Sequence, residues 1–478
     1  MVSDHDQRQL VQFLDSEPPR PLLGLVYGRR RIGKSTLLLE ETEAREGFYF
    51  EAIHAETPVQ LERLGAAIGD RLGVARIALD SWEHALVQLL QLDQERAMPV
   101  VLDEFGHILQ ADPSVASVLA STIGPGARRR GQAGRSRVVL CGSAIAMMRA
   151  LTVGEAPLRG RAGLELVIQP DDFRTAATRL EAPEDPELAA RVFAVIGGVV
   201  GYATDMVNDD LPTTIRDFER WIVDRVLSPA APLHYEATTL LAEDPSLAGG
   251  SDLLHHSILG AIANGSVTAG NIAKRVGRAV PNLAPALNRL VEAGFVTRHV
   301  DPVRKQRPVY ALADPYLQFH YAVLEPHRTA LRSRDRGEVW RERLIDTFNS
   351  HVRGPVFEQQ ARTWVERFAS QESIGGAADH VGPSVAHVDK IDVALDVVVA
   401  ASGDDPSART IIAIGEAKAG EALTQRHLHR LERARSALGP RASTAKLLLF
   451  GVEFHEELRK LDRHDLELID LERLYNGQ

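Results

Sequence analysis

The chain has almost no cysteine and no long apolar run, and each of these scarcities excludes a class of protein. Cys141 is the single cysteine among 478 residues, so no disulfide forms within the chain and a reducing cytoplasm is expected. No apolar run approaches the ~18 residues of a membrane-spanning helix, and the first residues lack the basic and apolar regions of a signal peptide. We therefore expect a cytoplasmic protein without a membrane partner.

An excess of positive charge and internal repeats are also lacking. The 55 Lys and Arg residues against 65 Asp and Glu residues give a net charge of −10, so a nucleic-acid surface must be local. The composition, with 44% hydrophobic and 25% charged residues, is ordinary for a globular protein. The length allows about two to four domains.

The most informative segment is a glycine-rich loop between an expected strand and an expected helix. Residues 28–35 match the pattern G-x-x-x-x-G-K-S/T and follow the apolar run 21–27. Successive amides of such a loop face one concavity, and the following helix adds the positive end of its dipole. Lys34 is expected to reach the β- and γ-phosphates of ATP, and Ser35 to ligate Mg²⁺. The expected nucleotide-binding residues here are Gly28, Arg29, Arg30, Arg31, Ile32, Gly33, Lys34, Ser35 and Thr36.

Two later apolar segments, 98–104 and 137–143, end in polar residues and are expected to be strands of the same parallel sheet. Asp103 is expected to hold Mg²⁺, largely through water, and Glu104 to act as general base for the attacking water. Ser143 is the candidate contact to the γ-phosphate. The alternative for Glu104 is an ordinary charge at the start of a surface helix.

The segment 156–162 carries two arginines in a short loop. Arg161 is counted among the nucleotide-binding residues, because its guanidinium can contact a phosphate directly or from a neighbouring subunit as an arginine finger. Solvated surface arginines are the alternative.

Four segments, 27–38, 100–106, 140–148 and 157–162, together resemble the prokaryotic archaeal-type P-loop ATPases, relatives of the AAA+ and STAND classes. The resemblance implies ATP binding and hydrolysis with Mg²⁺, a helical lid and a homo-oligomer. It continues into Ile196–Tyr202, where Val200 stands in place of the usual proline.

The middle of the chain is expected to be helical, and residues 253–313 predict three helices followed by a two-stranded wing. The third helix is expected to start at Asn282, with Pro285 in its first turn. Eight basic residues against two acidic ones give residues 267–310 a net charge of +6, which fits DNA-phosphate contacts by this region, including the wing. The alternative is a winged helix that packs against the ATPase core. The eight are Lys274, Arg275, Arg278, Arg289, Arg298, Arg304, Lys305 and Arg307.

Near the end of the chain, two expected strands, 394–400 and 410–418, flank a turn-rich loop and predict a hairpin. A hairpin symmetric about residue 406 places Asp396 opposite Glu416, and Lys418 shares a face with Glu416. Asp392 has the same parity and remains a rival for Asp396.

Two carboxylates and a lysine on one sheet face suit a hard divalent cation. Asp396 and Glu416 are expected to ligate Mg²⁺, and Lys418 to orient water or stabilise the phosphate. The arrangement is similar to the PD-(D/E)xK restriction-endonuclease-like fold, and Glu358 resembles the acid on the first helix of that fold. The helix at 423–438 carries basic residues toward a DNA backbone, whereas His427 and His429 are expected to be solvated.

The expected architecture is a multidomain α/β protein. Residues 1–165 form a parallel-sheet P-loop ATPase core, 166–250 a helical lid, 251–325 a winged helix and 326–478 a small α/β restriction-endonuclease-like domain. The expected function is ATP binding and hydrolysis coupled to DNA binding, with Mg²⁺-dependent cleavage by the last domain. The alternative is an ATP-dependent regulatory switch, or a DNA- or protein-binding module, whose nuclease-like domain is inactive.

Overall fold

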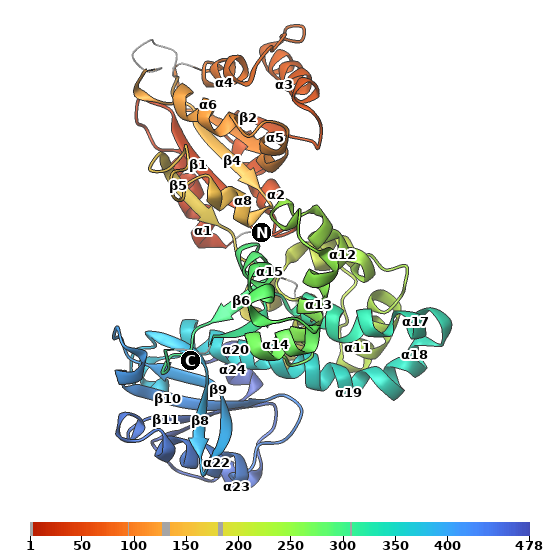
Figure 1. Ribbon diagram of the computed structural model, residues 1–478, viewed down its shortest axis with the longest axis vertical. Coiled ribbons are helices and arrows are strands. Elements are labelled where there is room, and N and C mark those ends of the chain that lie inside the picture. Colours follow the sequence, from red (N-terminus) through yellow and green to blue (C-terminus); the bar gives the residue numbers. More distant parts are fainter. Residues whose placement is uncertain (1–2, 94, 127–133, 180–184, 306–307) are drawn as a thin grey trace. The chain divides into compact units, whose positions relative to one another are not determined.

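The computed structural model describes residues 3–93, 95–126, 134–179, 185–305 and 308–478 (Figure 1). Arg307, one of the basic residues counted above, lies outside the described residues. The backbone divides into two compact units. Unit 1 comprises residues 1–170 with the short pieces 242–248 and 292–294, and unit 2 comprises residues 171–241, 249–291 and 295–478. Over the described residues, no helix has both the length and the apolar character needed to cross a membrane.

Unit 1 is built on a five-stranded parallel sheet with the order β2-β3-β4-β1-β5. Its strands β3 and β4 are buried along their whole length, as the continuous apolar runs predict for a parallel sheet covered on both faces. The carboxyl ends of all five strands lie at one edge of the sheet. The strands are β1 (Leu22–Tyr27), β2 (Phe48–Glu51), β3 (Pro99–Asp103), β4 (Arg137–Gly142) and β5 (Ala162–Val167).

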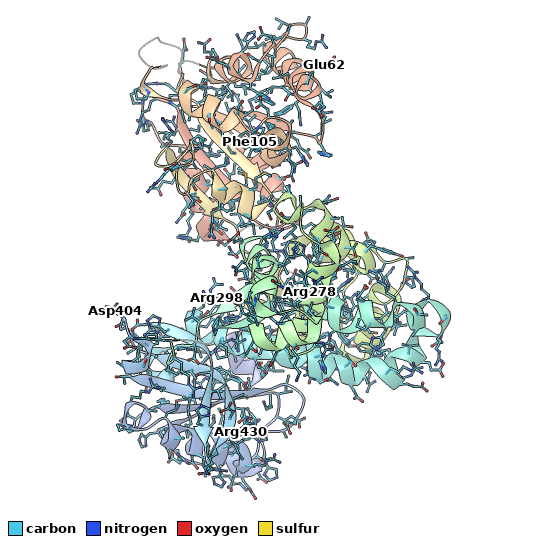
Figure 2. The ribbon with its side chains drawn as sticks, in the orientation of Figure 1. Glu62, Phe105, Arg278, Arg298, Asp404 and Arg430 are labelled. Carbon is cyan, nitrogen blue, oxygen red and sulfur yellow. The ribbon has the colours of Figure 1, made fainter. Side chains whose placement is uncertain are left out.

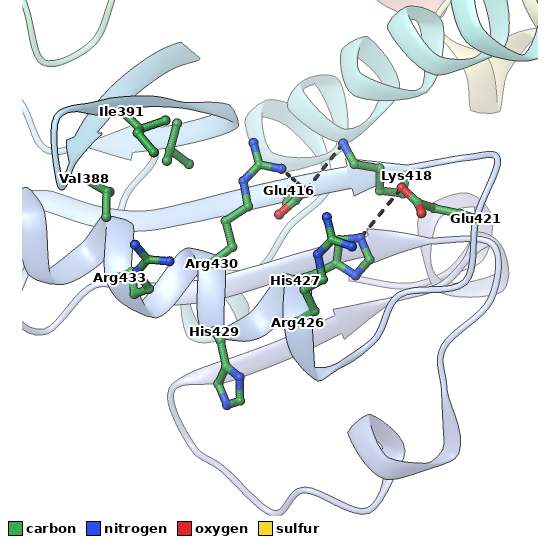
Figure 3. Close-up of a pocket in the computed structure, with 11 residues that line it drawn as sticks. Val388, Ile391, Glu416, Lys418, Glu421, Arg426, His427, His429, Arg430 and Arg433 are labelled. Atoms are coloured by element: carbon green, nitrogen blue, oxygen red, sulfur yellow. Dashed lines mark hydrogen bonds and ion pairs between the residues drawn. The ribbon is translucent and has the colours of Figure 1, made fainter.

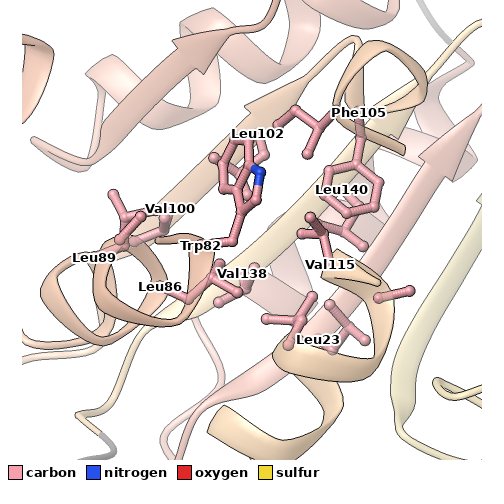
Figure 4. Close-up of a cluster of buried hydrophobic side chains, with 14 of the residues drawn as sticks. Leu23, Trp82, Leu86, Leu89, Val100, Leu102, Phe105, Val115, Val138 and Leu140 are labelled. Atoms are coloured by element: carbon pink, nitrogen blue, oxygen red, sulfur yellow. The ribbon is translucent and has the colours of Figure 1, made fainter. Parts of the chain in front are cut away.

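The core of unit 1 lies between this sheet and its helices (Figure 4). Trp82, at the start of α4, is buried in a cluster with Leu102 of β3 and Leu140 of β4. Burial of such a side chain contributes roughly 1.5–3 kcal/mol. Ser81 begins α4 by accepting a hydrogen bond from the amide of His84. The helices are α1 (Asp4–Leu14), α2 (Lys34–Glu43), α3 (Thr57–Leu72), α4 (Trp82–Leu90), α5 (Phe105–Ala111), α6 (Val115–Thr122) and α8 (Ile145–Ala150).

Unit 2 contains a second five-stranded sheet, of order β12-β11-β10-β9-β8. The pairs β8–β9 and β9–β10 are antiparallel, whereas β10–β11 and β11–β12 are parallel. The hairpin of β9 and β10 was predicted, but β8 and β12 were not. The strands are β8 (His380–Val388), β9 (Ile391–Ala400), β10 (Ile411–Lys418), β11 (Lys446–Gly451) and β12 (Leu466–Ile469).

This sheet has apolar clusters on both faces. Helix α20 (Gly354–Arg367) buries Phe357 and Trp364 against alternate residues of β9, such as Val397. Helix α22 (Gln425–Ala437) buries Leu428 and its neighbours against the opposite face. The two helices thus lie on opposite sides of the strands that carry the predicted acids.

Residues 252–312 form the elements that a winged helix requires, namely three helices followed by an antiparallel pair of strands. The third helix begins at Val280 rather than after Asn282, so Pro285 lies inside the helix and not in its first turn. This correction means that the helix lacks one internal hydrogen bond. The elements are α13 (Asp252–Ala263), α14 (Ala269–Val276), α15 (Val280–Glu292), β6 (Val296–His299) and β7 (Val309–Leu312).

The remaining described elements are mostly helical and precede or follow this segment. The α-helices are α9 (Phe173–Arg179), α10 (Pro186–Ile196), α11 (Ile215–Trp221), α12 (Leu233–Glu243), α16 (Pro315–Phe319), α17 (Glu325–Ser333), α18 (Arg336–Val339), α19 (Ile345–Phe348), α21 (Gln371–Ile374), α23 (Glu456–Arg459) and α24 (Leu471–Asn476). Short π-helical turns are η1 (Tyr202–Met206), η2 (Ile222–Val226), η4 (His320–Leu324), η5 (Trp340–Leu344) and η6 (Asn349–Arg353). The 3-10 turns are η3 (Pro245–Leu247), η7 (Pro406–Ala408) and η8 (Pro440–Ala442).

Residues 301–303, which follow β6, pack into the C-terminal sheet domain. Val303 is 1% exposed and belongs to the apolar cluster beneath α22. The buried carboxylate of Asp301 accepts hydrogen bonds of 2.9 and 3.0 Å from the Ser384 hydroxyl of β8. Lys305 forms an ion pair of 2.9 Å with Asp405. Residues 301–303 are therefore covered by protein, whereas Arg298 and Lys305 are exposed, so DNA contact by the basic residues of this region stays a prediction.

Burial lowers the pKa of several histidines in unit 2. Burial and the nearby charge of Arg328 lower the pKa of His320 to about 3, and burial and Arg362 lower that of His299 to about 4. In an unfolded chain these rings bind a proton near pH ~6.5. The unfolded state therefore gains protons first as the pH falls, so the stability contributed by these neutral rings is complete above about pH 6.5 and declines below it.

We predict that the free energy of unfolding falls between pH 7 and pH 5 by up to about 1.4 kcal/mol per pH unit for each such ring. Urea titrations at several pH values measure this slope. In a His320→Phe variant the free energy of unfolding should depend less steeply on pH, because the contribution of His320 is removed. An unchanged slope in His320→Phe would contradict the assignment.

Candidate nucleotide and metal sites

The loop between β1 and α2 folds around the side chain of Lys34. This lysine is buried at the start of α2 and donates hydrogen bonds of 2.8 Å to the carbonyl oxygens of Gly28 and Arg29. Gly33 has a φ of 90°, which favours glycine. A β-carbon on Gly28 would lie 2.3 Å from the carbonyl oxygen of Ile168, so only glycine fits there. Both glycines of the motif are thus required by the backbone.

The other residues of the loop differ in exposure. Arg29 and Ile32 are buried, whereas Arg30 is exposed. Ser35 and Thr36 are exposed on the first turn of α2. The structure therefore presents the hydroxyl groups at the helix start to a ligand, while the apolar part of the loop anchors it.

Asp103 is a buried carboxylate surrounded by hydrogen-bond donors. Its Oδ2 accepts a bond of 2.5 Å from the hydroxyl of Tyr49 on β2, and its Oδ1 accepts one of 2.8 Å from the amide of Glu104. Burial acts to raise the pKa of Asp103, but hydrogen bonds from Cys141, Ser35, Tyr49 and the Glu104 amide hold the pKa below its usual value. Asp103 is therefore an anion that faces Ser35, the arrangement of oxygens expected for Mg²⁺.

Glu104 and Ser143 meet at the same edge of the sheet. Glu104 has a left-handed backbone, with φ of 49° and ψ of 43°, which is uncommon for a residue other than glycine. The hydroxyl of Ser143, just after β4, donates a hydrogen bond of 3.2 Å to Oε2 of Glu104. The predicted general base and the predicted γ-phosphate contact are thus neighbours.

Arg161 lies at the opposite end of the sheet, which corrects its assignment to the nucleotide site. Strand β5 runs parallel to β1 with Ala162 beside Leu23, so Arg161 precedes the amino end of β5. The glycine loop begins after Tyr27, at the carboxyl end of β1. At ~3.3 Å per residue, Tyr27 lies about 13 Å farther along the sheet than Leu23. Arg161 cannot reach a nucleotide held by its own loop from there. Its contact with a neighbouring subunit stays a prediction.

Tyr49 was missed by the sequence analysis. Strand β2 pairs with β3 so that Glu51 lies beside Asp103 and Tyr49 beside Val101, on the same side of the sheet. The only signal in the sequence was the alternation of Tyr49 with apolar neighbours, and nothing there states which strand lies next to β3.

The predicted residues of the C-terminal domain also come together. The register of β9 and β10 pairs Val397 with Gly415, which places Asp396 opposite Glu416, as the symmetric hairpin predicts. The Nζ atom of Lys418 lies 3.6 Å from Oδ2 of Asp396 and 3.5 Å from Oε1 of Glu416. Oδ2 of Asp396 also accepts a hydrogen bond of 2.9 Å from the amide of Ala417.

Asp392 is excluded as the partner of Glu416. It is exposed near the turn between β8 and β9, where it pairs with His387. Asp396 is therefore the acid of β9 that belongs to the cluster.

Glu358 of α20 completes this cluster. Burial raises the pKa of Glu358, and the charge of Asp396 raises it further, although Arg362 and Lys418 oppose the shift. Arg362 is itself buried and donates a hydrogen bond of 2.9 Å to the carbonyl oxygen of Asp396. Burial acts to lower the pKa of Lys418, but Asp396, Glu416 and Glu358 outweigh it, so the pKa is raised and the ammonium is retained.

A groove of about 460 Å³ opens beside Glu416 and Lys418 (Figure 3). Helix α22 lines it with Arg426, Arg430 and Arg433, whose spacing of four and three residues places them on one helix face. Arg430 points toward the sheet and donates a hydrogen bond of 3.0 Å to Oε1 of Glu416. The groove is therefore lined by several cations next to the carboxylate cluster.

His427 differs from the expectation of a solvated side chain. Its Nδ1 accepts a hydrogen bond of 3.1 Å from the amide of Thr424 at the start of α22, and its side chain is 12% exposed. His429 is exposed, as expected. The two rings diverge, and the interaction of His427 serves to begin the helix.

No protein-family model matches the chain. An uncharacterized protein of Methanocaldococcus jannaschii is 24% identical over 348 residues, which cover 71% of this chain and 72% of that protein. A solved Walker-type ATPase of Pyrococcus abyssi has a TM-score of 0.50 and 18% identity, and the match covers 68% of this chain and 96% of that chain. The ORC2 protein of Aeropyrum pernix, solved in ADPNP and ADP complexes, has a TM-score of 0.44 and 17% identity over 69% of this chain and 93% of that chain.

At such identities the likeness to the Pyrococcus structure concerns the fold. The chain has the parallel-sheet α/β fold of a P-loop ATPase, and a separate sheet domain follows it in the sequence.

The hydrogen bond from Tyr49 to Asp103 leads us to predict that loss of the Tyr49 hydroxyl weakens Mg²⁺-dependent nucleotide binding. We expect Tyr49→Phe to need a several-fold higher Mg²⁺ concentration for binding of a fluorescent ATP analogue, because Asp103 loses a donor that orients it. Tyr27→Phe is the matched control, since it removes a similar bond of 2.7 Å to Glu165. Each variant should lose about 1–3 kcal/mol of stability. Equal Mg²⁺ requirements in the two variants would refute a role for Tyr49 at the metal.

Proposed function

We propose that this protein is a Mg²⁺-dependent ATPase that binds DNA and cleaves it at a metal-dependent site in its C-terminal domain. The ATPase part is carried by one observation: the glycine loop, Asp103, Glu104 and Ser143 meet at the carboxyl edge of a single parallel sheet. The nuclease part is carried by the cluster that joins Asp396, Glu416 and Lys418.

In the ATPase site, Lys34 would exchange its two carbonyl partners for the β- and γ-phosphates of ATP, while the loop amides bind the phosphate oxygens. Ser35 and Asp103 fit Mg²⁺, because a hydroxyl and an anionic carboxylate face each other there. Glu104 accepts the proton of the attacking water, and the hydrogen bond from Ser143 fixes the position of its carboxylate.

Exposed cations of the predicted winged helix supply a surface for the DNA backbone. Lys274 and Arg275 end α14. Arg278, which is labelled in Figure 2, precedes α15. All three are exposed, whereas Val303 of the predicted wing is packed into the sheet domain. We therefore propose that the turn between α14 and α15 contacts DNA, with Arg298 and Lys305 as further exposed cations.

In the C-terminal site, Asp396 and Glu416 offer two carboxylates on one sheet face, the number that Mg²⁺ commonly takes from protein while water fills its other positions. The metal, when bound, supplies an activated water and stabilises the leaving oxygen. Lys418 stabilises the negative charge that develops on the phosphate. The raised pKa of Glu358 suits it to take a proton from water near neutral pH.

A second candidate is a regulatory switch whose C-terminal domain is inactive. It is favoured by the ion pair of Arg430 with Glu416, which places a cation on a carboxylate that a metal would need. The two proposals differ in whether DNA is cut.

Lys418→Ala should abolish cleavage, with a loss of at least ~100-fold, because the variant removes the cation beside the phosphate. The assay is cutting of plasmid and branched DNA with Mg²⁺ or Mn²⁺, with and without ATP. Lys446→Ala is the matched control, since Lys446 lies on the adjacent strand and pairs with Glu467 outside the cluster. No cutting by the unmodified chain under any condition, with ATPase activity intact, would favour the regulatory switch.

Two variants separate ATP binding from hydrolysis. Lys34→Ala should lose ATP binding, because it removes the cation that reaches the phosphates. Glu104→Gln should bind ATP but hydrolyse it ~100-fold or more slowly, because it removes the general base. Equilibrium binding and phosphate release measure the two steps. Full hydrolysis by Glu104→Gln would overturn the role of Glu104, and ATP binding by Lys34→Ala would overturn that of the loop.

A further inference from the structure

The cluster at the end of β10 contains three carboxyl groups and three basic side chains. Its carboxylates are Glu358, Asp396 and Glu416. Its basic side chains are Arg362, Lys418 and Arg430. A divalent cation held by Asp396 and Glu416 adds two positive charges beside these three basic side chains. At such short separations the added repulsion favours the departure of one basic side chain.

Arg430 is the basic side chain that can leave most easily. Arg362 is buried and held by the carbonyl of Asp396, so its departure would leave a buried charge without a partner. Lys418 is 27% exposed and is needed beside the phosphate. The side chain of Arg430 is 42% exposed, and its other hydrogen bond, to the carbonyl of Ala394, is a long 3.4 Å.

The groove gives Arg430 an alternative partner. Arg426 and Arg433 flank it on the same face of α22, and the lining also includes Lys418. Among the described residues that line the groove, Glu421 is the one carboxylate besides Glu416, and its Oε1 lies 3.7 Å from Nε2 of His427. A groove with this many cations attracts phosphate groups, and the three arginines are ~4.5–6 Å apart along the helix axis at ~1.5 Å per residue, which is a spacing that can follow a nucleic-acid backbone.

We propose that Arg430 is an exchangeable cation: it pairs with Glu416 until a divalent cation binds that carboxylate, and it then turns to a phosphate of the DNA backbone in the groove. The inference rests on the proposed nuclease site. It makes metal binding and DNA binding mutually reinforcing, because each removes Arg430 from Glu416. It also explains why Arg430 pairs with Glu416 in the absence of metal, so this ion pair does not require that the C-terminal domain is inactive.

Arg433 provides a matched control for Arg430. It lies on the same helix face and lines the same groove, and its side chain is 63% exposed. Its ion pair of 2.7 Å is with Asp389, not with a member of the carboxylate cluster. Arg433→Ala therefore removes a cation of the groove without releasing a proposed metal ligand.

The first measurement is Mn²⁺ binding to the full chain by calorimetry, without DNA or nucleotide. Glu416→Gln identifies the part of the signal that comes from the C-terminal site. We expect Arg430→Ala to bind Mn²⁺ at that site several-fold more tightly than the unmodified chain, and Arg433→Ala to bind it equally. The second measurement is binding of a fluorescent DNA duplex in Ca²⁺ and in EDTA.

The DNA measurement tests the other half of the exchange. We expect Ca²⁺ to strengthen DNA binding by the unmodified chain and by Arg433→Ala, and to have little effect on Arg430→Ala. If Glu416→Gln leaves the whole Mn²⁺ signal in place, the metal site of the proposed function fails and the exchange fails with it. If Glu416→Gln removes signal but Arg430→Ala binds Mn²⁺ no more tightly, the exchange alone is overturned.

Discussion

The buried negative charge of Asp103 is the constraint on which the edge of the ATPase sheet depends. A carboxylate that is 1% exposed stays charged only if donors surround it. They come from three strands and the helix after the glycine loop: Tyr49 from β2, Cys141 from β4, the amide after β3, and Ser35 from α2. The hydrogen bonds to Asp103 therefore hold the carboxyl ends of the neighbouring strands in place. Glu104 and Ser143 follow two of these strands, so their positions are fixed as well.

The C-terminal cluster solves a related problem by different means. Its acids are neutralised mainly by side-chain cations rather than by neutral donors. Ion pairs at a groove exchange partners more readily than hydrogen bonds inside a sheet, because solvent and ligands can replace either member. The hydrogen bonds around Asp103 thus hold a fixed arrangement, whereas the ion pairs of the C-terminal cluster can change partners.

Local sequence patterns predicted features formed by residues close together in the sequence. They did not predict features that depend on which strands are neighbours in the folded protein. The glycine loop and the pairing of Asp396 with Glu416 follow from a motif and from the symmetry of one hairpin. Tyr49 and Arg161 were misjudged because strand order and strand direction set their places, and a single sequence does not state either. The edge strands β8 and β12 were missed because the first mixes polar residues into its alternation and the second has only four residues.

The buried side chain of Val303 bears on how freely this chain can be divided. The apolar cluster beneath α22 contains Val303, although that residue belongs to a loop between β6 and β7, well before the sheet it supports. A boundary drawn at residue 325 would separate the sheet from part of its own interior and leave a cavity the size of a valine. The C-terminal domain is therefore not self-contained, and recombination that transferred it to another protein would have to carry the preceding hairpin as well.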